Sequence, residues 1–293
     1  MTTQQEVAGS QRRRPSPAEL VRTMSYEVMP FRGTEQAVLE HVPTTVPLTV
    51  TVTEAKGLEP TLDLTERLLR HGYQVAPHLP ARQFTDRGHV AGVVARLSEA
   101  GVRSVFVIGG DAPKPAGEFA DAYALLRTMA DVGHPFTEVG IGGYPEGHAT
   151  ISAAALDEAL RAKAPLATRI ITQICFDAAV TGAWSAGIAA SGIDLPVHIG
   201  LPGPVNRQKL VRISAGIGLG QSARFLRKQQ NLVWRLLLPH GYEPTKLALR
   251  LAAEAPRGGI IGGLHVFTFN ELAKTEAWRR ELLARLDAKD VRA

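Results

Sequence analysis

Two carboxylates in this sequence occupy positions that suit acid–base or charge-stabilising chemistry. Glu27 lies inside the apolar run SYEVMP, and Asp111 follows the apolar run VFVIGG. A carboxylate inside an apolar strand is unfavourable unless it is paired or used, and burial raises its pKa. A carboxylic acid with a raised pKa is a general acid at neutral pH. We therefore expect Glu27 to be a catalytic acid, with a buried salt bridge as the alternative.

Further polar residues follow other apolar runs of the chain: Thr53, Glu54, His78, Tyr144, Glu146, His148 and Gln173. Together with Asp111 they suit the binding of a large planar ligand and the movement of a proton or hydride. Other chemistries are less well supported. His78 and His148 lack a second close zinc ligand, and neither a G-x-S-x-G elbow nor a Walker loop is present. The single cysteine, Cys175, lies in an apolar run and is expected to be a core thiol.

These residues are placed by eight strand-like runs separated by helical patterns. The runs are Ser25 to Pro30, Leu48 to Thr53, Gln74 to Leu79, Val102 to Gly110, Glu138 to Tyr144, Arg169 to Ile174, Pro196 to Leu201 and Gly263 to Phe269. Amphipathic stretches such as Thr61 to His71 and Thr85 to Ala100 end at glycines, as helices do. The alternation predicts a (β/α)8 barrel, whose chemistry lies at the carboxyl ends of its strands. A doubly wound open sheet is the rival, but the first strand is not followed by G-x-G-x-x-G.

The chain has 293 residues, which suits one barrel domain, and its net charge of +5 is mild. Residues 1–20, with Arg12 to Arg14, are expected to be a disordered basic leader, and residues 21–293 the catalytic domain. The stretch from Val205 to Gly262 is too long for a simple crossover. We expect a helical insertion there between strands seven and eight, with helices near 205–217, 221–238 and 243–255. Without a signal peptide or a long apolar run, a cytoplasmic location is expected.

The order of several short motifs resembles that of the methylenetetrahydrofolate reductase family. The motifs are SYEVMPFRG, VTVTEAKG, PHL, VIGGDAP, GGYPEGH, RIITQICFD, PGPVNRQK and HVFTFNELAKT, from Met24 to Leu283. The most specific are the Gly-Asp after the fourth strand, YPEGH and ITQ-x-x-FD. The resemblance implies a flavin-dependent catalytic barrel without a regulatory domain. It also implies a homo-oligomer in one-carbon metabolism and methionine biosynthesis, with neither nucleic acid nor membrane as a partner.

The resemblance further implies an enzyme that interconverts 5,10-methylene- and 5-methyltetrahydrofolate, with FAD reduced by NADH or NADPH. Glu27 matches the acid that protonates folate so that the methylene bridge opens to an iminium ion. Asp111 matches an aspartate near flavin and pterin that stabilises this cation, and Gln173 matches a glutamine that contacts pterin and nicotinamide. The positions that match the FAD site are Thr53, His78, Gly110, Asp111, Ala120, Tyr144, His148, Asp157 and Lys163.

The sequence departs from the family at several anchors of flavin and substrate: Gly109, Leu160, Ser214, Glu271 and Glu54. Two alternatives therefore stay open beside the FAD-dependent reductase. One is a flavin-independent reductase in which hydride passes directly from nicotinamide to the iminium. The other is a barrel subunit that binds folate or flavin without turnover, against which the joint presence of Glu27, Asp111 and Gln173 speaks.

Overall fold

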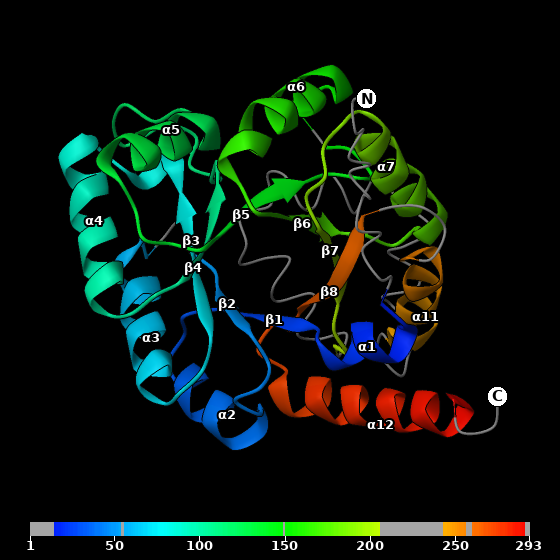
Figure 1. The fold of residues 1–293 in the computed structure, drawn as a ribbon. Helices are drawn as coiled ribbons and strands as arrows, with labels where there is room; N and C mark the ends of the chain where they lie inside the picture. Colours follow the sequence, from blue (N-terminus) through cyan, green and yellow to red (C-terminus); the bar gives the residue numbers. More distant parts are fainter. Residues whose placement is uncertain (1–14, 54–55, 149, 206–242, 256–259, 291–293) are drawn as a thin grey trace, which may run out of the picture.

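The chain folds into a closed barrel of eight parallel strands surrounded by helices (Figure 1). The computed structural model describes residues 15–53, 56–148, 150–205, 243–255 and 260–290. The strands pair in sequence order, and β8 returns to pair with β1. Their bounds are β1 Ser25–Val28, β2 Leu48–Val50, β3 Val75–Pro80, β4 Ser104–Ile108, β5 Glu138–Gly143, β6 Arg169–Ile174, β7 Val197–Pro202 and β8 Ile261–Phe267. The predicted (β/α)8 fold is confirmed, and all eight predicted strands are present with slightly shifted ends.

Helices of the described part of the chain form the outer layer; the first precedes β1, and the others follow strands. They are α1 Pro17–Arg22, α2 Thr34–His41, α3 Glu59–Arg70, α4 Arg87–Glu99, α5 Ala122–Val132, α6 Ala153–Lys163, α7 Ala178–Ala190, α11 Thr245–Glu254 and α12 Leu272–Asp290, with short 3-10 turns η1 Ala81–Gln83 and η2 Ala164–Leu166. The two amphipathic patterns correspond to α3 and α4. Gly72 and Gly101 follow these helices with φ values of +84° and +81°, the left-handed conformation in which helices commonly end.

The boundary expected at residue 20 between the leader and the barrel domain is wrong, because residues 17–20 belong to α1. Ser16 caps this helix: its hydroxyl accepts from the Glu19 backbone N–H, and the Glu19 carboxylate accepts from the Ser16 N–H. Leu20 and Val21 are fully buried. A capping box followed by apolar residues is a helix start, and this signal outweighs the polar composition around it. Residues 1–14 lie outside the described residues.

The crossover from β7 to β8 contains α11, which coincides with the helix expected at 243–255. It packs against α7, α1 and β7. The other two helices expected in this crossover, near 205–217 and 221–238, fall outside the described part of the chain apart from Val205. The helical insertion as a whole thus remains a prediction.

Alternation along β1 decides which side chains face the barrel interior. Tyr26 points outward, since its hydroxyl donates to Glu276 of α12 at 2.9 Å, and Glu276 also pairs with Arg279. Successive strand residues point to opposite faces, so Ser25 and Glu27 point into the barrel. Barrel interiors are usually filled by branched aliphatic residues. The polar groups inside this barrel therefore indicate a site.

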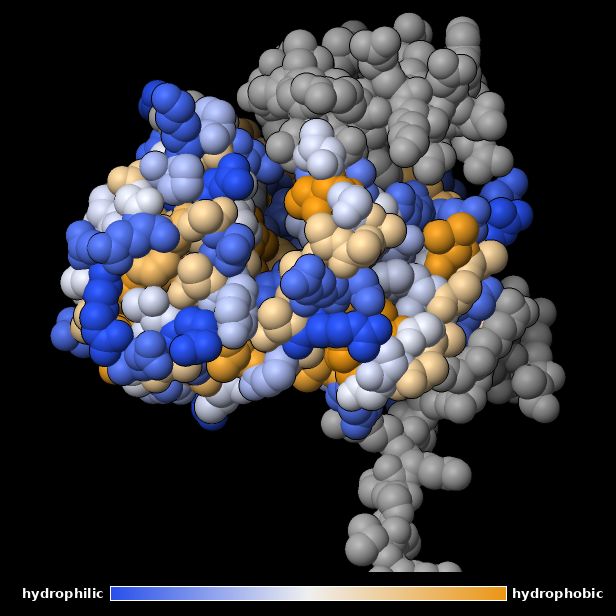
Figure 2. Space-filling model, turned by 90° about the horizontal axis from the view of Figure 1, so that it is seen from above, coloured by the Kyte–Doolittle hydropathy of each residue, from blue (hydrophilic) through white to orange (hydrophobic). Residues whose placement is uncertain are grey.

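The outer surface is mixed in character. On the face seen from above, hydrophobic residues lie between hydrophilic ones (Figure 2). Within the described ranges, no helix combines the length and the apolar character that crossing a bilayer requires. Cys175 is buried, as expected of a core thiol, and burial raises the pKa of its thiol to about 12.

Candidate functional site at the carboxyl end of the barrel

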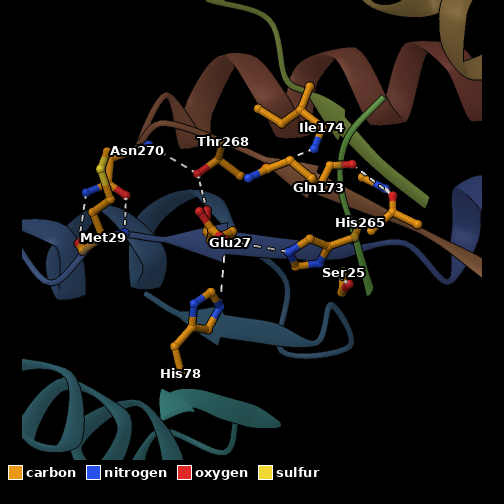
Figure 3. Close-up of polar contacts among 11 residues, drawn as sticks. Ser25, Glu27, Met29, His78, Gln173, Ile174, His265, Thr268 and Asn270 are labelled. Atoms are coloured by element: carbon orange, nitrogen blue, oxygen red, sulfur yellow. Dashed lines mark hydrogen bonds and ion pairs between the residues drawn. The ribbon is translucent and has the colours of Figure 1, made fainter. Parts of the chain in front are cut away.

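Glu27 lies inside the barrel beside two imidazoles, one from β3 and one from β8 (Figure 3). Its Oε2 atom is 3.6 Å from Nε2 of His78 and 3.9 Å from Nε2 of His265. Both distances exceed those of normal hydrogen bonds. Burial raises the pKa of the Glu27 carboxyl, and His78 opposes this rise without cancelling it. The carboxyl group thus keeps its proton more readily than an exposed glutamate does.

The two imidazoles are neutral in the folded protein. Burial lowers the pKa of His78 to about 4 and that of His265 to about 3. The Nδ1 atom of His265 is 2.8 Å from the Ser25 hydroxyl, which fixes the ring. His265 was not singled out in the sequence, although its alternation with apolar neighbours in GLHVFTF is a signal for an inward-facing position. Because neither ring is charged, Glu27 has no cationic partner at neutral pH among the described residues.

Side chains after β8 hold the end of β1. Thr268 donates from its hydroxyl to the Glu27 carbonyl at 2.6 Å. The Asn270 amide accepts from the Met29 N–H at 2.9 Å and donates to the Met29 carbonyl at 3.0 Å and to Thr34 Oγ1 at 2.8 Å. Phe269 and Asn270 have φ values of +50° and +57°. Two consecutive non-glycine residues in this conformation are strained, and such strain concentrates at functional sites.

At the opposite end of the barrel, Arg169 of β6 makes direct polar contacts. Its guanidinium donates to the Ser104 hydroxyl at 2.7 Å and pairs with Glu138 at 2.9 Å. His198 of β7 is a third inward imidazole, whose pKa burial lowers to about 3, with the charge of Arg169 acting in the same direction. We call Ser104, Glu138, Arg169 and His198 the floor cluster.

Asp111 is exposed on the loop after β4, and this loop is fastened to the turn after β3. Arg82 donates from Nε to the Ala120 carbonyl and from Nη1 to the Ala112 carbonyl, each at 2.9 Å. Gly110 has a φ of +87°, and a Cβ there would lie 2.9 Å from Cβ of Pro80, so the turn requires glycine. Burial raises the pKa of Tyr144, and the charge of Asp111 adds to this rise, so the two residues are electrostatic neighbours.

Gln173 of β6 is exposed, and its side-chain oxygen accepts from the N–H of Ile174 at 3.0 Å. The loop that follows is secured by Glu146. Its Oε1 accepts from the N–H groups of Phe176 at 2.5 Å and Asp177 at 2.8 Å, while its buried Oε2 lacks a hydrogen-bond partner in the described part of the chain. The glutamate of YPEGH therefore orders the loop beside Gln173, a role that sequence reasoning did not assign.

The residues expected to hold FAD fit this cofactor in part. Thr53 Oγ1 is buried and lacks a partner among the described residues, so a ligand could bond it. The rings of Tyr144 and His148 meet edge to face at 5.4 Å. Lys163 is buried at the end of α6, and burial lowers the pKa of its ammonium group while Asp121 opposes this. These residues offer a hydroxyl, ring faces and a cation, the groups that a flavin dinucleotide uses.

Other positions of the expected FAD site contribute less. Asp157 is exposed and pairs with Arg161 at 3.0 Å, and Leu160, a departure from the family, is packed in the core. His78 faces Glu27, and Arg82 donates to the Ala120 carbonyl. Among the other departures from the family, Glu271 pairs with Lys274 at 2.9 Å. Glu54 and Ser214 lie outside the described residues. The fit is thus better near Asp111 and at Lys163 than along the rest of α6.

Comparison with known protein families identifies the chain's family. The model of the methylenetetrahydrofolate reductase family matches residues 14–216, well over half of the sequence. The chain belongs to this family. The expectation from the motifs is confirmed, and with it the folate-related character of the barrel.

Solved structures confirm the fold at low sequence identity. An uncharacterized protein from Clostridium thermocellum that binds two copies of 5-methyl-5,6,7,8-tetrahydrofolic acid is similar at a TM-score of 0.58 and 10% identity, over 90% of this chain and 96% of that one. The C-terminal domain of a chitinase candidate from Desulfitobacterium hafniense DCB-2 is similar at 0.54 and 12%, over 90% and 99%. This chain spans 56% of a mandelate racemase/muconate lactonizing enzyme from Bordetella bronchiseptica RB50, with 89% of its own length covered, at 0.44 and 14%. That last likeness is too distant to bear on function.

Proposed function

We propose that the protein is a methylenetetrahydrofolate reductase, which transfers hydride from NADH or NADPH to 5,10-methylenetetrahydrofolate, or catalyses the reverse reaction in one-carbon salvage. The observation that carries this proposal is Glu27, a buried carboxyl with a raised pKa inside a barrel of this family. Support comes from the Clostridium thermocellum barrel, which binds 5-methyltetrahydrofolic acid. The substrate needs such an acid because its methylene bridge opens only after a bridge nitrogen is protonated.

In the proposed mechanism Glu27 gives its proton to the amine nitrogen of the methylene bridge. The bond from that nitrogen to the methylene carbon breaks, and an iminium ion forms on the other nitrogen. Hydride then adds to the methylene carbon and gives the methyl group. The neutral state of His78 and His265 serves this step, because a cationic imidazole would hold Glu27 as the anion.

Asp111 and Gln173 take the roles of stabilising the cation and reading the pterin. They lie at the carboxyl ends of β4 and β6, the two neighbours of β5. A carboxylate near an iminium ion lowers its energy most in a pocket that excludes water. The pterin edge presents donors and acceptors that a carboxylate and an amide can bond together. In the proposed complex, the Asp111 carboxylate lies beside the iminium cation and the Gln173 amide lies beside the edge of the pterin ring.

We assign FAD as the expected carrier, which would supply the hydride when bound. The residues proposed to hold it are Thr53, His78, Gly110, Asp111, Ala120, Tyr144, His148, Asp157 and Lys163. The unpartnered Thr53 hydroxyl and the buried Lys163 ammonium support this assignment. A second candidate is direct hydride transfer from the nicotinamide to the iminium, favoured by the buried Leu160 and by the pairing of Asp157 with Arg161.

The test is an assay of the purified protein with methylenetetrahydrofolate and each nicotinamide nucleotide, with and without added FAD. Bound FAD is detected by its visible absorbance after removal of the free cofactor. Turnover that requires bound FAD supports the first route, and turnover by protein that binds none supports the second. Folate binding without turnover under any of these conditions would overturn the enzymatic proposal in favour of a binding subunit.

A further inference from the structure

The loop between β4 and α5, residues 109–120, carries Asp111 and has no regular secondary structure. Phe119 is its one buried residue. The Asp111 side chain is exposed, and among the described residues none donates a hydrogen bond to its carboxylate. The position of this carboxylate is therefore set by the path of the loop backbone, and not by contacts of the side chain itself.

Arg82, in the short turn η1 after β3, bonds this loop at four points. Its backbone N–H donates to the Gly109 carbonyl at 3.1 Å, and its backbone carbonyl accepts from the Ala116 N–H at 2.8 Å. Its guanidinium donates from Nε to the Ala120 carbonyl and from Nη1 to the Ala112 carbonyl, each at 2.9 Å. A single residue thus bonds the loop from its first residue to its last.

Two glycines allow the loop to lie directly against the segment after β3. A Cβ on Gly110 would lie 2.9 Å from Cβ of Pro80, and a Cβ on Gly117 would lie 1.8 Å from the carbonyl oxygen of Thr85. That same carbonyl accepts from the N–H of Glu118 at 2.9 Å. A larger residue does not fit at either glycine, so the close approach of the two backbones is a designed feature of the sequence.

The chemistry of the guanidinium suits it to hold a loop by its backbone. It presents its donors in a fixed plane, whereas a lysine ammonium is a compact point charge on a flexible stem. Arg82 is half-buried, and its described partners are backbone carbonyls and not carboxylates. Hydrogen bonds from a charged donor are stronger than those between neutral groups. Such bonds fix the path of the loop.

We propose that Arg82 is a positioning residue of the reaction, which holds the loop after β4 so that the Asp111 carboxylate lies beside the iminium cation. The Ala112 carbonyl that Arg82 bonds belongs to the residue next to Asp111, so loss of this bond releases the backbone where it orients the carboxylate. The attraction between the two charges falls as their distance grows. This proposal rests on the proposed function, which supplies the cation.

The experiment measures kcat with methylenetetrahydrofolate in Arg82→Met and Arg82→Lys, each with Asp111 intact and with Asp111→Asn. Arg82→Met keeps the bulk of the stem and loses both guanidinium bonds, so kcat should fall about 10-fold. Arg82→Lys keeps the charge and can bond one of the two carbonyls, so it should recover part of this loss. With Asp111→Asn, Arg82→Met should lower kcat no further, because its effect passes through that carboxylate.

Arg87→Met is the matched control. Arg87 is an exposed arginine at the start of α4 that also donates to a backbone carbonyl, that of Asp131 at 3.0 Å. Its replacement should leave kcat within about twofold of wild type. Equal losses of kcat from Arg82→Met with and without Asp111→Asn would overturn the positioning role. Full activity in Arg82→Lys would also overturn it, because the charge and not the fork would then matter.

Hydrogen exchange followed by mass spectrometry tests the hold on the loop without substrate. Arg82→Met should speed exchange in the segment that contains the Ala116 and Glu118 amides and leave the barrel strands protected, whereas Arg87→Met should change neither. Unchanged exchange in Arg82→Met would overturn the proposal. A wild type without folate turnover would remove the proposed function, and faster exchange in Arg82→Met would then leave Arg82 as a structural residue only.

Discussion

The two ends of the barrel interior treat their charged groups in opposite ways. At the floor, the Arg169 guanidinium bonds Ser104 and Glu138 at 2.7 and 2.9 Å. At the mouth, Glu27 lies 3.6 and 3.9 Å from two imidazoles that are neutral at physiological pH. A paired charge contributes to stability, whereas a buried carboxyl without a cation has a raised pKa and is available for proton transfer. The same barrel thus separates a paired polar cluster from a buried carboxyl without a cationic partner, which we propose is the reactive one.

The mouth also differs from the floor in how its backbone is held. Thr268 and Asn270 bond the backbone of Glu27 and Met29, and Arg82 bonds the backbone of the loop that carries Asp111. These contacts fix the main chain and leave the acidic side chains free for a ligand. Catalytic groups need such positioning because small displacements reduce the rate strongly. The comparison therefore predicts different consequences for substitutions at the two ends.

The largest expected effect is on turnover when the acid at the mouth is removed. Glu27→Gln keeps the shape of the side chain and loses the transferable proton, so turnover should fall on the order of 100-fold or more. Steady-state assays with methylenetetrahydrofolate measure this. Glu138→Gln in the floor cluster is the control and should retain turnover within about twofold. Near-normal turnover in Glu27→Gln would remove this residue from the mechanism.

Next in size is a loss of stability when the cation at the floor is removed. Arg169→Gln should lower the free energy of unfolding by about 2 kcal/mol, because it breaks hydrogen bonds to a largely buried charged group. Urea denaturation followed by circular dichroism gives this value. Turnover per folded molecule should change little. If Arg169→Gln lowered turnover as strongly as Glu27→Gln, the floor would not be purely structural.

A smaller effect is expected from the clamp on β1. Asn270→Gly tolerates the left-handed backbone at this position but loses three side-chain hydrogen bonds, so turnover should fall about 10-fold through misplacement of Glu27. Asn270→Ala loses the same bonds and adds backbone strain, and should be the less stable of the two. Thermal unfolding and turnover of both variants separate these contributions. Full turnover in Asn270→Gly would mean that Thr268 alone positions the end of β1.

The smallest effect concerns the pH dependence of stability. The folded pKa of Glu27 is raised, so the native state binds its proton more tightly than the unfolded state does. Stability from this group is present below its unfolded pKa and is lost as the pH rises through its folded pKa. Glu27→Gln should therefore melt at a higher temperature than wild type at pH 8 and at a similar temperature at pH 4. A gain of equal size at both pH values would contradict the raised pKa.

The fold and one residue of the site, Glu27, could be predicted because the sequence patterns that indicate them are local. The apolar strand runs, the amphipathic patterns ending at Gly72 and Gly101, and the lone carboxylate in SYEVMP all report on residues within a few positions of one another. The polar composition before Leu20 indicated disorder. The capping box at Ser16 instead begins α1, so the ordered domain extends further toward the N-terminus than the composition suggested. In this case a short hydrogen-bonding motif outweighed the average composition.

By itself, the sequence determined the barrel, its family and the position of Glu27 within the apolar first strand. Only the tertiary structure decided what surrounds this acid: His78 comes from β3, and His265, Thr268 and Asn270 come from the far end of the chain. Closure of the barrel brings β8 beside β1, and no pattern within one segment records that contact. The pKa of a buried group depends on its neighbours in space, so the chemistry of Glu27 is fixed by residues that lie far from it in the sequence.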